Sequence, residues 1–228
     1  MFFINTLDGI NQRIQNVYYD GASYSDGYDR TRMLGLLFGR PESQILQREI
    51  IPSLNYFNER SAYAIDFFFG GYIPPKESEH NQYDDQQPVD GSAPTGHGYF
   101  SATAFTRLRQ DIESVSTWKY SGAVDLILLT SRMSTQSRLK LDFSKTLVLN
   151  LQKCRESKLI PSIDQFFELV FRFAEEYDGN DPISSFSAAL EKGVAVSAMA
   201  GGIKSFIPKI LHKEIDRTAL FAVKNRER

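Results

Sequence analysis

The stretch YAIDFFFGGYIPP, residues 63–75, predicts a buried β-strand that ends in a turn. From Ala64 to Phe69 every residue is apolar except Asp66, and a short apolar run is typical of a strand covered on both faces. Two glycines, a tyrosine and two prolines follow and stop the run. This strand either delivers a site at its end or is a core strand that finishes in a structural turn.

A second apolar run lies upstream, in RMLGLLFGR at residues 32–40, and predicts another buried strand. Apolar residues at 46, 50, 54 and 57 have helical spacing and predict a helix over 41–60. We expect Pro41 in the first turn of this helix and a kink or a break at Pro52. Because a helix connects the two strands, they are expected to be parallel.

The chain downstream of the quoted stretch starts with a polar segment, 76–98, which predicts either a mobile lid or a disordered insertion. Ser101 is a candidate N-cap for an amphipathic helix that runs to Val115. Two further strands are predicted at 124–129 and 139–152. Their link of about ten residues is too short for a crossover helix, so they are expected to be antiparallel. Ser162 and Gln165 form a capping-box pair that opens another helix.

The predicted element order from residue 32 is β-α-β-α-β-β-α, followed by C-terminal helices. This order indicates an α/β three-layer sandwich with a mixed sheet. We divide the chain into an N-terminal extension (1–31), an α/β domain with the polar insertion 76–98 (32–178) and a C-terminal helical segment (179–228). The small-residue stretch 193–203 is too short to span a bilayer and favours a helix-packing or oligomer contact.

The composition excludes several classes of protein. The 228 residues carry a net charge of −2, so there is no basic field that would draw the chain to nucleic acid. Cys154 is the only cysteine, which excludes an internal disulfide and a cysteine-rich zinc site. The N-terminus has no basic region followed by an apolar one, so we expect no signal peptide and a cytoplasmic protein.

Signatures of catalysis and of cofactors are missing from the sequence. The three histidines, His80, His97 and His212, have no metal-ligand spacing to one another or to the cysteine. The glycine-rich stretch 91–99 matches neither nucleotide-binding pattern, and no serine lies in a nucleophile elbow. We therefore expect no metal and no cofactor.

The candidate site lies where open α/β sheets bind ligands, beyond the carboxyl ends of the parallel strands. The residues predicted there are Arg40, Glu42, Gly70, Gly71, Tyr72 and, from the later strand, Arg132, with 76–98 as a lid. Asp66 either has a partner or lies on a solvent-facing side of the strand, and a buried, partnered Asp66 is a candidate general acid or base. Trp118 and Tyr120 flank a glycine turn and are either a stacking platform for a base or peptide or part of the core.

The element order over residues 32–177 resembles the thioredoxin fold, which runs β-α-β, a linking helix, then β-β-α. In that family the C-x-x-C motif sits where the first strand meets the first helix. Here the same junction is Phe38-Gly39-Arg40-Pro41-Glu42-Ser43, so the resemblance implies a non-redox relative. The family's cis-proline has no counterpart in SGAVDLILL either. A flavodoxin-like or nucleoside-hydrolase-like sheet stays open. The combination NERS, IDFFFGGY, WKYSG and DLILL also resembles uncharacterised bacterial proteins of the kind found in phage-defence loci.

Two functional hypotheses follow. The first is a non-catalytic interaction or accessory subunit of a bacterial system, which binds a protein partner or a second copy through its C-terminal helices. The alternative is an enzyme or nucleotide-binding effector with a site at the carboxyl edge of the parallel strands. The enzyme hypothesis requires a concave polar pocket at that edge, and the interaction hypothesis requires an exposed apolar patch on the C-terminal helices.

Overall fold

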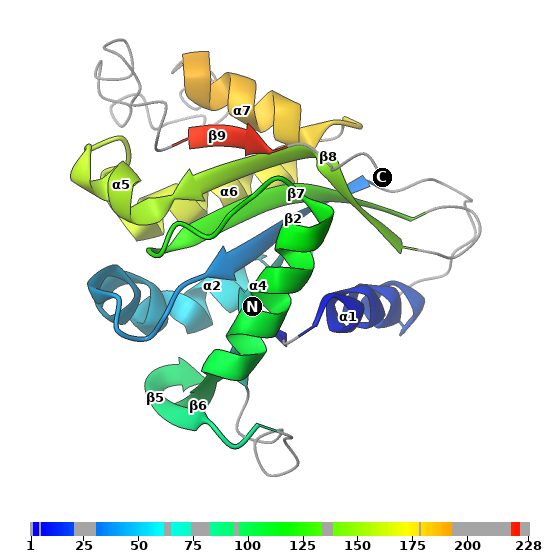
Figure 1. Cartoon of the computed structure of the whole chain (residues 1–228). Helices are drawn as coiled ribbons and strands as arrows, with labels where there is room; N and C mark the ends of the chain where they lie inside the picture. Colours follow the sequence, from blue (N-terminus) through cyan, green and yellow to red (C-terminus); the bar gives the residue numbers. More distant parts are fainter. Residues whose placement is uncertain are drawn as a thin grey trace.

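A mixed six-stranded β-sheet forms the centre of the protein in a computed structural model (Figure 1), in the order β1-β3-β2-β7-β8-β9. The structure describes residues 2–4, 6–20, 31–61, 65–73, 83–93, 96–133, 139–177, 179–192 and 220–223. In sheet order, the strands are β1 (Phe2–Ile4), β3 (Ile65–Gly70), β2 (Thr31–Phe38), β7 (Asp125–Met133), β8 (Leu139–Asn150) and β9 (Leu220–Val223).

The strand directions agree with those predicted from the sequence. β2 and β3 are parallel, with Leu34 opposite Asp66 and Leu37 opposite Phe69. β7 and β8 are antiparallel, and β7 is also antiparallel to β2. Two successive antiparallel pairings bring β8 back to the direction of β2, so both strands end at the same edge of the sheet.

Helices cover both faces of the sheet (Figure 1). On one face, the ring of Phe67 in β3 lies 5.2 Å from that of Phe167 in α6 (Ile163–Glu176). On the other face, the ring of Phe38 in β2 lies 5.9 Å from that of Phe105 in α4 (Ala102–Val115). Alternate residues of a strand point to opposite faces, so strands covered on both sides need the continuous apolar runs seen in the sequence. The prediction of an α/β fold with a mixed sheet is confirmed.

Two predicted helix starts are confirmed at the level of single hydrogen bonds. The Ser101 side chain accepts from the backbone N–H of Ala104 at the start of α4. The Ser162 side chain accepts from the backbone N–H of Gln165 at the start of α6. Each serine therefore pairs one of the backbone donors that a helix leaves open in its first turn.

The helix expected over 41–60 is divided by Pro52, as predicted. A π-helix η1 (Leu46–Ile50) passes into a short 3₁₀-helix η2 (Ile51–Ser53) and then into α2 (Leu54–Ser61). Proline has no N–H to continue the ladder, and its ring displaces the carbonyl one turn earlier, which accounts for the widened turn before it. Pro41 lies before the helix, in a turn closed by the N–H of Ser43 on the carbonyl of Arg40 (3.0 Å).

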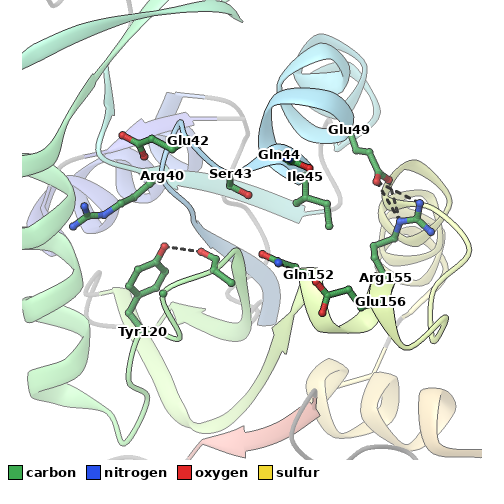
Figure 2. A pocket seen from close by; sticks show the side chains of 12 residues that line it. Arg40, Glu42, Ser43, Gln44, Ile45, Glu49, Tyr120, Gln152, Arg155 and Glu156 are labelled. Atoms are coloured by element: carbon green, nitrogen blue, oxygen red, sulfur yellow. Dashed lines mark hydrogen bonds and ion pairs between the residues drawn. The ribbon is translucent and has the colours of Figure 1, made fainter.

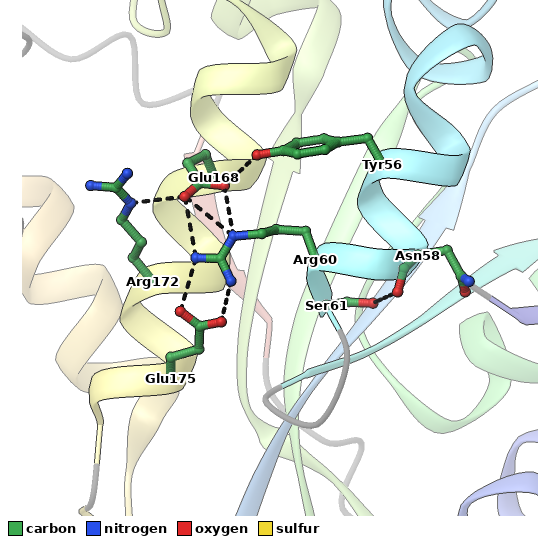
Figure 3. Close-up of polar contacts among 7 residues, drawn as sticks. All are labelled: Tyr56, Asn58, Arg60, Ser61, Glu168, Arg172 and Glu175. Atoms are coloured by element: carbon green, nitrogen blue, oxygen red, sulfur yellow. Dashed lines mark hydrogen bonds and ion pairs between the residues drawn. The ribbon is translucent and has the colours of Figure 1, made fainter.

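A network of side chains fastens α2 to α6 (Figure 3). The Arg60 guanidinium donates to the carboxylates of Glu168 and Glu175, and the Tyr56 hydroxyl donates to Glu168 (2.7 Å). Arg172 donates to Glu168 from one turn further along α6 (2.8 Å). Arg60 therefore joins the end of α2 to two carboxylates of a helix more than 100 positions later in the chain.

A second sheet, in the order β4-β6-β5, extends from the end of β3. It consists of β4 (Tyr72–Ile73), β5 (Gln86–Ala93) and β6 (Gly96–Ser101). Much of the segment expected to be an unstructured polar loop is thus a hairpin, and residues 74–82 and 94–95 lie outside the described part. A hairpin forms through backbone hydrogen bonds, and within 86–91, the part of β5 whose burial is described, only Val89 is buried, which explains why apolar content gave no signal.

The two ends of the chain also differ from the predictions. β1 and β9 were not predicted as elements of the fold, yet β1 pairs with β3 and β9 with β8. The opening residues of the sequence indicate a short helix, and α1 (Leu7–Asp20) is a helix of 14 residues there. α7 (Pro182–Lys192) confirms the helix at the start of the C-terminal segment, but Leu220–Val223 is a strand where a helix was expected. No described helix is both long and apolar enough to cross a membrane.

Candidate functional site

A polar groove of about 670 Å³ lies at the edge of the sheet where β2 and β8 end (Figure 2). Its walls are the segment that leaves β2, the turn before β7, and α5 (Leu151–Glu156), which follows β8. The lining residues are Arg40, Glu42, Ser43, Gln44, Ile45, Glu49, Tyr120, Gly122, Ala123, Gln152, Arg155 and Glu156. The groove therefore occupies the carboxyl edge, where ligands bind in open α/β sheets.

The first wall is the turn that begins at Arg40. Pro41 at its second position fixes the backbone, since its φ angle suits that place in a β-turn. The Arg40 guanidinium lies 5.6 Å from the centre of the Phe105 ring, and no hydrogen bond or ion pair joins it to another described residue. The hydroxyl of Ser43 is buried and has no hydrogen-bond partner within the described chain. This wall therefore carries a cation without an ion pair and a hydroxyl without a hydrogen bond, as far as the described residues go.

Tyr120 forms the second wall, and its ring is held by the turn that precedes β7. Its hydroxyl donates to the carbonyl of Ala123 (2.6 Å). Burial raises the pKa of Tyr120 to about 12, and the negative charge of Asp125 acts in the same direction. The phenol therefore stays protonated near neutral pH, and its free lone pairs can accept a hydrogen bond from a ligand.

Asp125, at the first position of β7, holds that turn in place through hydrogen bonds. Its carboxylate accepts from the backbone N–H and hydroxyl of Ser121 and from the indole of Trp118 (3.2 Å). Asn150, the last residue of β8, donates to the same Ser121 hydroxyl (2.9 Å). Burial raises the pKa of Asp125, while the hydrogen bonds from Ser121 and Trp118 oppose that shift. The buried carboxylate, with its three donors, therefore holds the turn that carries Tyr120 against the sheet.

An ion pair closes the far end of the groove. Arg155 of α5 donates through two nitrogens to the Glu49 carboxylate, with Nε 3.2 Å from Oε2. Glu49 also accepts from the N–H of Ile163, and Arg155 donates to the carbonyl of Pro161 (2.6 Å). Both charges are therefore neutralised and tie η1, α5 and the start of α6 together. Gln152 and Glu156 lie beside this pair, joined by a hydrogen bond of 2.9 Å.

The predicted site residues are divided by the structure. Arg40, Glu42 and Tyr120 come together in the groove, as the edge argument predicted for the first two. Of the other four residues predicted at this edge, Gly70, Gly71 and Tyr72 are buried. The Tyr72 ring is stacked on Phe69 with 3.6 Å between ring centres, so side chains fill the exit of β3.

Three further candidates lie away from the groove. Arg132 pairs with Thr31 at the opposite end of β2, so its backbone lies about 23 Å from the carboxyl edge at a rise of about 3.3 Å per residue. Asp66 is buried beside Leu34, about 13 Å from that edge by the same rise. Trp118 is 1% exposed and packs on Phe38, which leaves no open ring face for stacking.

Sequence reasoning missed the residues that α5 and η1 contribute. Glu49, Gln152, Arg155 and Glu156 lie in helices and belong to no recognised motif. The signal that could have found them is the strand direction, since residues that follow β8 reach the same edge as those that follow β2.

Comparisons with known proteins give no assignment: no family model matches the chain, and no curated protein and no solved structure matches it either. Within the described residues, no group of three or more histidine, cysteine or acidic side chains is placed to hold a metal ion.

Proposed function

We propose that this protein is an α/β ligand-binding domain whose groove takes a small polar molecule. The groove itself carries the proposal, because three segments distant in the sequence meet there and place polar side chains around one concavity. Its volume lies within the range of about 300–1,000 Å³ that is usual for small-molecule sites. Among the lining side chains, Ser43 has no hydrogen bond to a base in the described chain, which favours binding over nucleophilic chemistry.

The element order from β2 to α6 supports the thioredoxin-like resemblance within this proposal. Where that family has its redox motif, the chain has the turn from Arg40 to Ser43, which lines the groove. The single thiol, Cys154, is 1% exposed, and burial raises its pKa to about 12. A buried and protonated thiol is inert, in line with a non-redox relative that kept the position of the site and changed its chemistry.

The accessory-subunit hypothesis depends on a surface that the described residues do not contain. α7 turns Ile183, Phe186 and Ala189 into the core, and residues 193–219 lie outside the described part of the chain. Binding through the C-terminal segment therefore stays a prediction, and no observation on the described residues supports it as the groove supports ligand binding.

A fragment screen by two-dimensional NMR tests the proposed function. Fragments that bind should shift the amide signals of 40–49, 120–123 and 152–156. The substitution Gln152→Trp fills the groove from α5 and should abolish these shifts. Gln110→Trp is the matched control, because Gln110 is also exposed but lies on α4 outside the groove. Fragment shifts that map elsewhere, or that persist in Gln152→Trp, would overturn the proposal.

A further inference from the structure

The charges that line the groove are unequal, and this inequality indicates what the groove binds if the function proposed above is correct. Five lining residues are charged: Arg40, Arg155, Glu42, Glu49 and Glu156. Arg155 and Glu49 neutralise each other at the far end. One cation and two carboxylates are left without an ion pair to any described residue, so the groove offers a residual charge of −1.

Arg40 is placed to receive an anionic group. Its guanidinium is exposed at the edge of the groove and rests over the Phe105 ring, which restricts the side chain before any ligand arrives. A guanidinium fork of this kind binds a carboxylate through two parallel hydrogen bonds. The rigid turn at Pro41 adds to this order, so less conformational entropy is lost on binding.

The two unpaired carboxylates lie at different places along the groove. Figure 2 shows Glu42 at the same end as Arg40, and Glu156 beside Gln152, nearer to the Glu49–Arg155 pair. Ile45 lies between these ends, and the unpartnered hydroxyl of Ser43 is close to the middle. A ligand that satisfies all three charges needs a carboxylate and an ammonium close together and a second cation separated from them by an apolar stem.

We infer that the ligand of the groove is a basic α-amino acid, with its carboxylate on Arg40, its α-ammonium on Glu42 and its side-chain cation on Glu156. Such a ligand has a net charge of +1 and compensates the residual −1 of the groove. Its methylene stem would pass Ile45, the one large aliphatic side chain of the lining.

Titration calorimetry of the full chain tests this assignment with L-lysine and three analogues. L-Lysinamide lacks the carboxylate, Nα-acetyl-L-lysine lacks the α-ammonium, and L-norleucine lacks the side-chain ammonium. Each analogue should bind about three- to tenfold more weakly than lysine, the range expected for one charge-assisted contact at a partly exposed site.

Three variants then assign each charge to its residue. Arg40→Gln should bind lysine and lysinamide equally, Glu42→Gln should no longer distinguish the acetylated analogue, and Glu156→Gln should no longer distinguish norleucine. Arg48→Gln is the control and should behave as wild type, since Arg48 is exposed on η1 but does not line the groove.

Failure of the inference differs from failure of the proposed function. If lysine does not bind, or binds equally to the four variants and wild type, the ligand class is overturned. The proposed function still stands if other fragments shift the groove amides and Gln152→Trp abolishes those shifts. Both fail if no probe reaches the groove in either experiment.

Discussion

The exit of β3 offers a direct test of how the fold is held, through the substitution Gly71→Ala. Gly71 has a φ of +81°, a conformation that costs an L-residue about 1–2 kcal/mol. A Cβ at this position would lie 2.6 Å from the Cβ and 3.0 Å from the Cα of Phe105. The backbone of α4 cannot yield as a flexible side chain would, so overpacking adds about 1–3 kcal/mol. We expect a loss of about 2–5 kcal/mol in the free energy of unfolding.

Gly122→Ala supplies the matched control for this measurement. Gly122 has a similar φ of +85°, but nothing lies within 4 Å of a Cβ built there. Only the backbone cost of about 1–2 kcal/mol applies, so this variant should lose less stability than Gly71→Ala. Urea unfolding followed by circular dichroism measures both. If the two variants lie within about 0.5 kcal/mol of each other, the close approach of α4 to Gly71 is not a packing constraint.

Three further predictions concern single side chains. Arg60→Gln should lower the free energy of unfolding by about 1 kcal/mol, because it removes the residue that bridges Glu168 and Glu175. This loss should be smaller in high salt, which screens ion pairs. The control Arg107→Gln breaks no described ion pair and should cost nothing measurable. Asp85 accepts from Ser101 (2.6 Å) and the N–H of Thr103 (2.8 Å); burial acts to raise its pKa, but these hydrogen bonds prevail and lower it. Its contribution is therefore present above the unfolded pKa of about 4 and lost as the pH falls, so Asp85→Ala should cost about 1 kcal/mol at pH 7 and less at pH 3 in urea unfolding. Cys154 should resist a thiol reagent at pH 8 in the folded protein and react at once in urea, because burial raises its pKa to about 12; rapid labelling of the folded protein would contradict the buried position.

The centre of the fold could be predicted because its signals are local. Ser101 and Ser162 mark helix starts through bonds that span three residues, and Pro52 breaks a helix through its own ring. The apolar runs of β2 and β3 are long enough to indicate strands buried on both faces. Each of these inferences needs only neighbouring residues, and each agrees with the structure.

The outer strands could not be predicted because their partners decide them. Phe2–Ile4 is a strand since the exposed edge of β3 supplies its hydrogen bonds, and Leu220–Val223 depends in the same way on β8. β5 is a strand because β6 supplies its hydrogen bonds, and Val89 is its one side chain described as buried, so its polar sequence looks the same as that of a loop. When two segments far apart in the chain pair, neither sequence needs a hydrophobic periodicity that would reveal the pairing.

The groove lies at the edge of the sheet that the sequence analysis chose, but only some of the residues predicted there line it. Arg40 and Glu42 follow β2 directly, so the edge rule reached them. Glu49 and Arg155 were out of reach because they meet across 106 positions of the chain, and only the strand order places them together. Tyr72 was included because it follows β3, although its ring is buried against Phe69.

The order of the strands determines where along the edge of the sheet the groove lies. β2 and β3 are adjacent and parallel, but the chain that leaves β3 turns at once through Gly71 into β4, and Phe105 of α4 packs on that turn. On the other side, β7 lies between β2 and β8, so the chains that leave these two strands are about 10 Å apart at a spacing of about 4.8 Å per strand. β7 begins at this edge, and only the short turn from Tyr120 to Ala123 rises between them. The gap of two strand spacings holds the groove, with the turn before β7 as one of its walls, whereas the gap of one spacing beside β3 is filled by side chains. The position of the groove along this edge is therefore set by the antiparallel strand inserted between β2 and β8, and not by the parallel pair.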